Sequence, residues 1–464
     1  MKSIVSSRSG IKNLRELTRD WGAREKVSHY LDRCQVDTPS DVVEATWRHV
    51  IQLRKSVGKV VDFGAGDGRF CRTGRYASYI GYEIDSRRSH GTKLPKSAKI
   101  IHRCAFSDTI SDADICIGNP PFVRNQDLPL GWRERVSAIM QARTGVALSG
   151  LANAWQYFFL LSLVSAKADG LVALVIPYEW VSRPASRLLR EYIEEQRWDV
   201  SVYRLVDTTF DSVLTTSSIT IVDKSKRNGV WRYFEENASG KFAQLASPSG
   251  ATNGVIPYLP RSQVNKQGPR AVRGLSPGTQ KVLTLTEGER VRFGLKIRTD
   301  VVPCITTLRM LPQDVKRLND AIFREFYRFA GQKCWLIRTD RKPSRALRAY
   351  LNAVPKADYQ TSTCLERKEW WKFKMPPIPS LLMSMSFRGR FPKGVRNDIS
   401  ARAVGGVCGI FNITAANGTE LVNGLKGVDI RSRIVAHSNG LRKIEINQLN
   451  SLIATASGRG RAKQ

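Results

Sequence analysis

The sequence predicts an α/β fold in which a mainly parallel β-sheet is covered by helices, followed by a second domain that is α/β or mostly β. Three observations favour this fold class. In the first half of the chain, short apolar runs alternate with helical stretches, as in a parallel sheet with crossover helices. The first of these apolar runs leads directly into a glycine-rich turn. Near residue 223 the apolar periodicity is lost, and a different, strongly basic composition follows.

The elements of the first half are predicted from their apolar periodicity. Leu151–Ala166 is apolar and aromatic enough for a helix packed on the sheet, and Arg187–Glu195 has the period of a more exposed helix. Short apolar runs predict strands at Lys59–Phe63, Ser78–Glu83, Lys99–His102, Ala113–Ile117, Leu171–Ile176, Val202–Leu205 and Ser217–Val222.

The domain organisation follows from where this pattern stops. We expect a first domain over residues 1–222 and a loosely structured connector over 223–280, which is rich in Gly, Ser, Pro and Asn. A second domain is expected over 281–457. The basic tail 458–464 is predicted to be disordered.

The charge of the chain indicates a polyanionic partner. Its 464 residues include 74 Lys and Arg against 41 Asp and Glu, a formal net charge of +33. Such a chain attracts nucleic acid, because cations that contact phosphates release condensed counterions. An anionic membrane surface would also attract it, but no basic amphipathic helix stands out. The charge therefore favours nucleic acid.

The cysteines and the N-terminal sequence bear on the compartment. None of the eight cysteines forms a C-x-x-C pair, and there are five histidines. Scattered single cysteines suit a reducing compartment, and we expect no metal site. No apolar stretch is long enough for a signal peptide or a membrane span. We therefore expect a cytoplasmic protein without a membrane partner.

A glycine-rich turn indicates a cofactor site. The strand Lys59–Phe63 runs into Gly64-Ala65-Gly66-Asp67-Gly68, and Glu83 lies 21 positions after Asp62 at the end of the next strand. Glycines allow positive φ and close approach of a ligand, and a carboxylate at about 20 residues' distance can accept both hydroxyls of a ribose. The turn alone also occurs without a ligand. Together, turn and acid favour an adenosine-containing cofactor, with a dinucleotide still open.

A second motif points to chemistry on an amine. The strand at 113–117 ends in Asn119-Pro120-Pro121-Phe122. This could be an ordinary turn, but two prolines fix an extended backbone and hold the Asn119 side-chain oxygen and the Pro120 carbonyl as acceptors. Two acceptors that bind its hydrogens can favour a pyramidal, nucleophilic nitrogen on an aromatic amine. Phe122 offers a ring against which a base can stack.

In motif order the first half resembles the gamma-class, TaqI-like adenine-specific DNA methyltransferases. The matching segments are Asp37–Val43, Asp62–Gly68, Glu83-Ile84, Asn119–Phe122, Gly170–Trp180 and Phe210. The resemblance implies a Rossmann-like fold that binds S-adenosylmethionine and methylates the 6-amino group of a flipped adenine in double-stranded DNA.

The same resemblance assigns site residues. Asn119, Pro120 and Phe122 would be catalytic, and Phe122 and Phe210 would stack on the flipped base. The expected cofactor-binding residues are Thr38, Pro39, Asp62, Gly64, Ala65, Gly66, Gly68, Glu83, Ile84, Phe106 and Asn119. We expect Trp155, Tyr157, Phe158 and Phe159 to be core residues.

Two departures from the family pattern stand out. The family often has Asp-Phe after the third strand, where this chain reads Cys104-Ala105-Phe106-Ser107-Asp108. The acid that would bind the adenine amine of the cofactor is therefore missing unless Asp108 supplies it. Phe122 also replaces a tyrosine, which keeps the stacking but removes a hydroxyl contact.

The second half interleaves cations with aromatic residues, as nucleic-acid grooves do. Its order is loosely similar to the TaqI-like C-terminal specificity domain, so we expect it to bind DNA as a target-recognition domain. A solvated basic surface is the plainer alternative for some of these residues. The expected DNA-binding residues are Arg292, Lys296, Arg298, Arg338, Arg341, Lys342, Arg367, Trp370, Trp371, Lys372, Arg388, Arg390 and Arg396.

Two other functions compete with this interpretation. Methyltransferases of release-factor glutamine or of ribosomal RNA also use Asn-Pro-Pro-aromatic, but the glutamine enzymes usually lack a long basic second domain. A catalytically inactive, methylase-like DNA-binding protein is disfavoured by the intact Asn119, Glu83 and glycine turn. We expect a nucleoid-associated monomer that serves a restriction-modification system, with a separately encoded endonuclease, or acts as an orphan methylase.

Overall fold

The computed structural model describes residues 36–108, 110–129, 131–210, 215–252, 254–438 and 441–461. The chain divides into two compact units. The first reaches Gly254 and includes Ala436–Gly440, and the second comprises Val255–Val435 and Leu441–Gln464. Within the described residues, no helix is long and apolar enough to cross a membrane.

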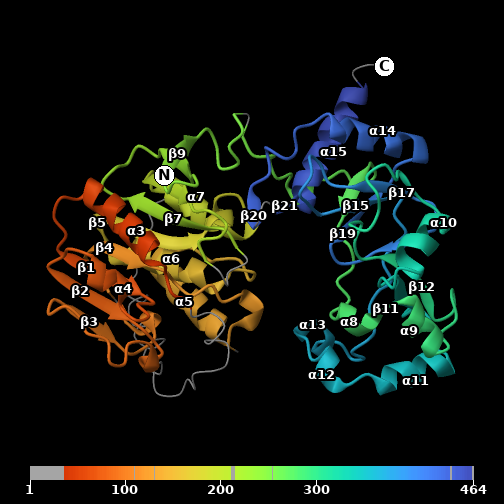
Figure 1. Cartoon of the computed structure of the whole chain (residues 1–464), viewed down its shortest axis with the longest axis horizontal. Coiled ribbons are helices and arrows are strands. Elements are labelled where there is room, and N and C mark those ends of the chain that lie inside the picture. Colours follow the sequence, from red (N-terminus) through yellow and green to blue (C-terminus); the bar gives the residue numbers. More distant parts are fainter. Residues whose placement is uncertain are drawn as a thin grey trace. The chain divides into compact units, whose positions relative to one another are not determined.

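The first unit is built on a mixed sheet, which has nine strands within the described residues, in the order β3-β2-β1-β4-β5-β7-β6-β8-β9 (Figure 1). β1 to β5 pair in parallel, whereas β7 is antiparallel to both β5 and β6. The strands are β1 Lys59–Phe63, β2 Ser78–Tyr82, β3 Ala98–Ile101, β4 Ala113–Gly118, β5 Ala166–Pro177, β6 Asp199–Arg204, β7 Ser217–Asp223, β8 Trp231–Glu236 and β9 Phe242–Leu245.

All seven predicted strands are present in this sheet, with shifts at their ends. β5 begins at Ala166 rather than at Leu171, because residues 166–170 continue the pairing with β4 through a bulge near Ala113. Residues 115–117 of β4 and 171–176 of β5 are continuously apolar, and every residue of β7 is buried although Ser218 and Thr220 are polar. Continuous apolar runs of this kind are typical of strands covered on both sides.

The predicted boundary at residue 222 is placed too early. β8 pairs in parallel with β6, and β9 pairs with β8, so the sheet continues into the stretch predicted to be a connector. Every residue of β8 is only partly buried. A strand whose side chains are all partly exposed lacks the apolar periodicity on which the prediction depended.

The helices of the first unit cover the sheet. Val43, Trp47 and Val50 of α3 pack on one face, and the Trp47 indole donates to the Phe70 carbonyl at 2.8 Å. The helix predicted to begin at Leu151 is α6, which begins at Ala154 in the structure. Leu151 lies exposed in the turn before it. The α-helices are α3 Ser40–Leu53, α4 Arg69–Thr73, α5 Trp132–Thr144, α6 Ala154–Ser165 and α7 Arg187–Glu195; 3₁₀ turns are η1 Ser86–Arg88, η2 Ala105–Ser107, η3 Asn125–Asp127, η4 Tyr178–Val181 and η5 Pro184–Ser186.

The second unit is α/β, with sheets in the orders β10-β19-β15-β17-β13 and β11-β14-β12-β18 and a pair formed by β16 and β21. Its strands are β10 Arg270–Val272, β11 Thr284–Leu285, β12 Val301–Ile305, β13 Arg317–Leu318, β14 Trp335–Ile337, β15 Leu381–Ser384, β16 Ser386–Phe387, β17 Gly394–Asn397, β18 Arg402–Ala403, β19 Val407–Phe411 and β21 Leu441–Lys443. The strand β20, Ala436–Ser438, is part of the segment that belongs to the first unit.

Short helices connect these strands, and apolar clusters around Trp335 and around Ile410 form the cores of the unit. α15 continues to Arg461, so the tail predicted to be disordered from residue 458 is helical to residue 461; residues 462–464 lie outside the described part. The helices are η6 Arg261–Gln263, α8 Gln280–Leu283, α9 Glu287–Arg292, α10 Asp320–Phe323, η7 Arg324–Arg328, α11 Arg345–Ala353, α12 Lys356–Tyr359, α13 Ser362–Leu365, α14 Ala415–Lys426 and α15 Ile446–Arg461.

Candidate functional site

The candidate site of the first unit lies where the strand order changes direction. β2 and β3 follow β1 on one side, and β4 and β5 follow on the other. Ligands of open α/β sheets bind beyond the carboxyl ends of the strands at such a switch point. A pocket opens there between the segments that follow β1, β2 and β4. Its lining includes the predicted cofactor-binding residues Thr38, Gly64, Ala65, Gly66, Glu83, Ile84 and Asn119.

The glycine turn brings the backbone close to the Asn-Pro-Pro segment. Gly64 and Gly66 have φ of 114° and 56°, in the region that favours glycine. A Cβ at Gly64 would lie 3.5 Å from Cδ of Pro121. Gly68 does not line the pocket; it precedes α4, and a Cβ there would lie 3.0 Å from Leu94. The close packing of Leu94 thus explains why a glycine stands at position 68.

The Glu83 carboxylate is held by the glycine turn. Its Oε2 accepts from the Gly66 amide at 3.0 Å, and its Oε1 accepts from the Asp85 amide at 2.9 Å. Burial raises the pKa of Glu83, while these two N–H groups oppose the rise because they bind the charged form. The carboxylate faces the pocket with lone pairs free to accept from a diol.

Asp62 lies beneath the pocket and does not line it. Its side chain is fully buried, and its Oδ2 accepts from the Tyr79 hydroxyl at 2.6 Å. No described residue bonds to its Oδ1. Burial raises the pKa of Asp62 to about 7. Asp62 thus lies buried against Tyr79 of β2, in contrast to the expected direct contact with a ligand.

The Asn-Pro-Pro-Phe segment follows β4 directly. Asn119 and Pro121 line the pocket, whereas Pro120 is buried and Phe122 is partly buried beside the lining. Phe210 is 8% exposed and belongs to the core cluster beneath α3. Residues 211–214, which follow it, lie outside the described part. The structure therefore brings Asn119 to the pocket but does not bring Phe210 to it.

An aromatic wall forms part of the pocket lining. Trp132 and Phe158 line the pocket, and Phe106 contacts both edge-to-face with ring centroids 5.7 and 4.9 Å apart. Phe106 itself is buried behind this wall. Phe158 was expected to be a core residue, and that prediction is wrong for this position; Trp155, Tyr157 and Phe159 are buried as expected. Helical spacing alone does not distinguish a wall residue from a core residue.

Asp108 does not take the place of the missing acid at the pocket. Its Oδ2 accepts from the Tyr82 hydroxyl at 2.8 Å and pairs with Arg103. Tyr82 and Arg103 line the pocket, whereas Asp108 does not. Asp108 thus helps to position Tyr82 and Arg103, two residues of the pocket lining.

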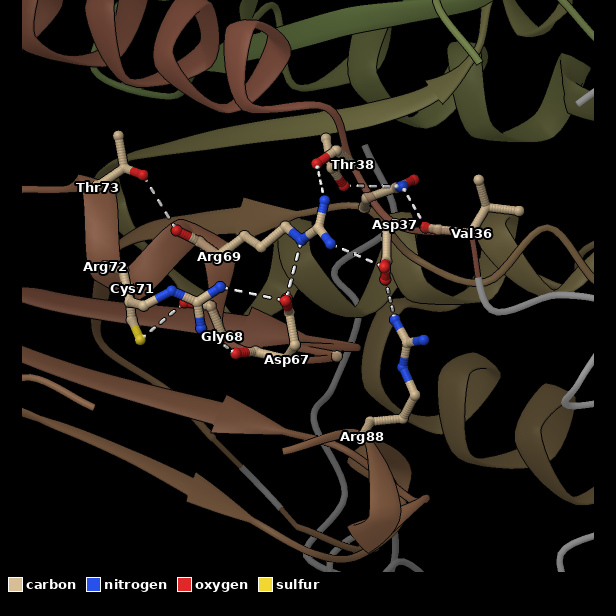
Figure 2. A network of polar contacts seen from close by, with 12 residues as sticks. Val36, Asp37, Thr38, Asp67, Gly68, Arg69, Cys71, Arg72, Thr73 and Arg88 are labelled. Carbon is tan, nitrogen blue, oxygen red and sulfur yellow. Dashed lines mark hydrogen bonds and ion pairs between the residues drawn. The ribbon is translucent and has the colours of Figure 1, made fainter. Parts of the chain in front are cut away.

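The segment Val36–Thr38 closes another side of the pocket. Asp37 pairs with Arg69 at 2.8 Å and also with Arg88, and the Arg69 guanidinium donates to the Thr38 carbonyl at 2.9 Å (Figure 2). Pro39, predicted to bind the cofactor, precedes α3 and does not line the pocket. The sequence reasoning missed Arg69 and Arg88, because no local pattern links them to Asp37.

In the second unit, many of the predicted DNA-binding cations are exposed: Arg292, Lys296, Arg298, Arg341, Lys342, Lys372, Arg388 and Arg390. Others hold the fold together. Arg338 pairs with Asp340 at 2.6 Å, Arg367 donates to the Pro277 carbonyl at 2.6 Å, and Arg396 pairs with Asp398 at 2.6 Å.

The two predicted tryptophans are partly buried against the core. Trp370 stacks on Tyr359 with ring centroids 4.2 Å apart, and Trp371 packs on the same cluster. A small pocket elsewhere in this unit is lined by Phe391 and by four cations, namely Lys316, Lys393, Arg396 and Lys426, of which Arg396 was predicted to bind DNA. Among the described residues, no cluster of His, Cys, Asp or Glu is arranged to hold a metal ion.

Comparison with known proteins bears on the first unit. Residues 84–212 match the family model of the Eco57I restriction-modification methylase. This segment resembles a restriction-modification methylase. It contains Asn119–Phe122 and ends two residues after Phe210, whereas the glycine turn precedes it.

The curated Type II methyltransferase M.XamI of Xanthomonas campestris pv. amaranthicola is 25% identical over 249 residues, which cover 49% of this chain. The match spans 45% of that protein, less than half its length.

Solved structures of restriction-modification proteins are also similar. The type I methyltransferase subunit from Streptococcus thermophilus is 17% identical, covers 45% of this chain and 50% of its own, and has a TM-score of 0.37. A nuclease-deletion mutant of the Type ISP enzyme LlaGI, solved with a DNA substrate mimic, is 10% identical, covers 90% of this chain and 54% of its own, and has a TM-score of 0.47.

Proposed function

We propose that the chain is a gamma-class DNA methyltransferase that transfers a methyl group from S-adenosylmethionine to the 6-amino group of a flipped adenine. The observation that carries the proposal is the position of Asn119. Its side chain lines the same pocket as the Gly64–Gly66 turn and Glu83. The match of residues 84–212 to a restriction-modification methylase supports this function. Modification within such a system, or as an orphan methylase, is part of the proposal.

The residues around the pocket fit this cofactor. Glu83 is anchored by two backbone N–H groups and keeps acceptor capacity for the two ribose hydroxyls. Trp132 and Phe158 offer apolar surface for a purine ring. When bound, the cofactor supplies a methyl group on a positively charged sulfur. The pocket lies at the switch point of the strand order and is lined by the glycine turn, which is where open α/β sheets bind their ligands.

Asn119 and Pro120 would act on the target amine as acceptors. The Asn119 oxygen and the Pro120 carbonyl bind the two amine hydrogens, which localises the nitrogen lone pair for attack. This interaction becomes stronger as the amine acquires positive charge, so it favours the transition state over the ground state. Phe122 and Phe210 would contact the extruded base, and Phe210 would have to leave its position in the core cluster to reach it.

The second unit would supply DNA affinity and sequence recognition as a TaqI-like specificity domain. Its exposed Arg and Lys residues suit contacts to phosphates. The direct partner would be double-stranded DNA, with a separately encoded endonuclease as the companion in a restriction system. A monomer suffices for this arrangement, since one catalytic unit and one recognition unit lie in the same chain.

The test is transfer of labelled methyl groups from S-adenosylmethionine to DNA, with the product bases separated. We expect 6-methyladenine at a discrete sequence. Methylated cytosine would overturn the choice of base, methylated release factor or ribosomal RNA would favour the competing enzymes, and DNA binding without transfer would favour an inactive methylase. Asn119→Ala should slow transfer by about 10²–10³ while binding of DNA and cofactor changes little.

A further inference from the structure

The Asn119 amide has a defined orientation in this structure. Its Nδ2 donates to the Thr38 hydroxyl oxygen at 3.0 Å and lies 3.5 Å from the Val36 carbonyl oxygen. A carbonyl oxygen can only accept, so the amide atom that faces this segment must be the nitrogen. The Oδ1 atom then points away from Val36–Thr38. The segment before α3 thus decides which end of the Asn119 amide is presented to a substrate.

Thr38 is itself held in place. It is 5% exposed, and its carbonyl accepts from Arg69 at 2.9 Å. The neighbouring Asp37 carboxylate bridges Arg69 of α4 and Arg88 of η1, one oxygen to each (Figure 2). Three segments that are far apart in the sequence are joined in this way around the pocket. The buried backbone that carries the Thr38 hydroxyl is therefore fixed beside Asn119.

The orientation matters for the proposed chemistry. If the amide rotated by half a turn, an NH₂ group would face the amine hydrogens, and no acceptor would remain on that side. Loss of the bond from Nδ2 to Thr38 removes a preference for the productive orientation of about threefold to tenfold, the usual worth of one neutral hydrogen bond. Rotation of a side-chain amide leaves the shape of the pocket unchanged.

We propose that Thr38 is a positioning residue, which acts through Asn119 by holding its amide with Oδ1 toward the target amine, and that Asp37 with Arg69 and Arg88 secures it. This inference rests on the proposed methyl transfer to an amine. It differs from the role of Thr38 as a simple cofactor contact, because it predicts an effect on the transfer step and not on cofactor affinity.

The experiment compares Thr38→Val, which keeps the size but loses the acceptor, with Thr38→Ser, which keeps the hydroxyl. Single-turnover methyl transfer to DNA is measured at saturating cofactor, and cofactor affinity is measured by calorimetry. We expect Thr38→Val to slow transfer by about threefold to tenfold with a nearly unchanged dissociation constant, and Thr38→Ser to restore the rate. Thr73→Val, on the exposed side of α4, is the matched control and should keep the wild-type rate.

A double-mutant cycle tests whether Thr38 acts through Asn119. In an Asn119→Ala background, Thr38→Val should slow transfer by less than about twofold, since the amide it positions is gone. Equal effects in both backgrounds, a loss confined to cofactor affinity, or failure of Thr38→Ser to rescue would each overturn the inference while leaving the proposed function intact. A wild-type chain that transfers no methyl group to an amine would overturn both.

Discussion

Gly118 illustrates how one residue limits the geometry of the site. It is the last residue of β4, has a φ of 147°, and immediately precedes Asn119. A Cβ there would lie 2.2 Å from Oδ1 of the buried Asp62. Asp62 is fully buried and bonded to Tyr79, and the φ of Gly118 is positive, so glycine is favoured where the strand passes into the Asn-Pro-Pro segment. The position of Asn119 thus depends on the absence of a side chain before it.

Gly118→Ala should destabilise the first unit by at least about 2 kcal/mol, from the positive φ and from the contact with Asp62. The measurement is the free energy of unfolding in denaturant. Gly145→Ala is the control, since Gly145 has a φ of 73° but no atom within 4 Å of its added Cβ. Gly145→Ala should lower the free energy of unfolding by about 1 kcal/mol, because only the positive φ opposes the added Cβ. Equal losses in the two variants would contradict the steric explanation.

Asp62→Asn should raise stability at high pH only. Burial raises the pKa of Asp62 to about 7, above its usual value of 3.8, so the folded state binds a proton that the unfolded state has released. The free energy of unfolding of the wild type therefore falls as the pH rises from about 4 to 7. Above about pH 7 the whole cost of burying the ionised Asp62 carboxylate is present. Melting temperatures of both proteins at pH 5 and pH 8 test this. A difference between them that is the same at both pH values would refute the assignment.

Glu83→Ala should weaken binding of S-adenosylmethionine by about 1.5–3 kcal/mol for each charge-assisted hydrogen bond that is lost. Calorimetric titration of the folded variant measures this. Asp108→Asn is the comparison, because Asp108 does not line the pocket. Because the Asp108 side chain, within the described part of the chain, bonds only to the lining residues Tyr82 and Arg103, we expect a smaller loss. An equal loss in the two variants would contradict the assignment of Glu83 as the main cofactor acid.

At the scale of elements, α9 and β14 are joined through one carboxylate. Glu287 accepts from Arg290 at 2.9 Å and from the Trp335 indole at 2.6 Å, and it also pairs with Arg328 of η7 at 2.5 Å. Thr286 and Glu289 form a capping box at the start of the same helix. Short helices are marginal alone, so this helix depends on such tertiary bonds. Glu287 therefore links three elements of the second unit.

Glu287→Gln should destabilise the second unit by about 1–3 kcal/mol, because it removes a charge that three donors share. The bond to Arg290 is the main cause that lowers the pKa of Glu287 to about 2. The stabilisation is thus fully present above the usual pKa of 4.5 and is lost as the pH falls through about 2. Unfolding monitored between pH 6 and pH 2 should show the two proteins converging in acid. A constant difference over this range would show that the charge is not the cause.

For the whole molecule, the net charge is +33, and many of the Arg and Lys side chains in the described part of the chain are exposed and suit phosphate contacts. Several predicted contacts instead serve the fold: Arg338, Arg367 and Arg396 each bond to a carboxylate or a carbonyl. The exposed cations of the second unit are therefore the better candidates for DNA affinity, and the paired ones for domain stability.

DNA affinity of the full chain should fall by about 10³ or more between 50 and 200 mM salt if six or more phosphates are contacted. Arg341→Gln and Lys342→Gln should each lower the slope of log affinity against log salt by about one. Arg187→Gln, at an exposed arginine that pairs with Glu191 in the first unit, is the control. Affinity that is independent of salt would rule out the phosphate contacts.

The sequence by itself determined the strands of the central sheet, the glycine turn and the position of Asn119 at a strand end. These features are local: apolar runs, positive-φ glycines and prolines set the backbone over a few residues. Because parallel strands place their carboxyl ends at one edge, the meeting of Gly64, Glu83 and Asn119 in one pocket followed from the same pattern.

Only the tertiary structure decided which other residues complete the site and where the first unit ends. Phe158 lines the pocket although its spacing is that of a core helix, and β8 joins the sheet without an apolar period. The bond from Asn119 to Thr38 joins residues 81 positions apart. Contacts of this kind depend on how the chain closes in space, where side chains with ordinary local surroundings become neighbours, and no local pattern encodes that closure.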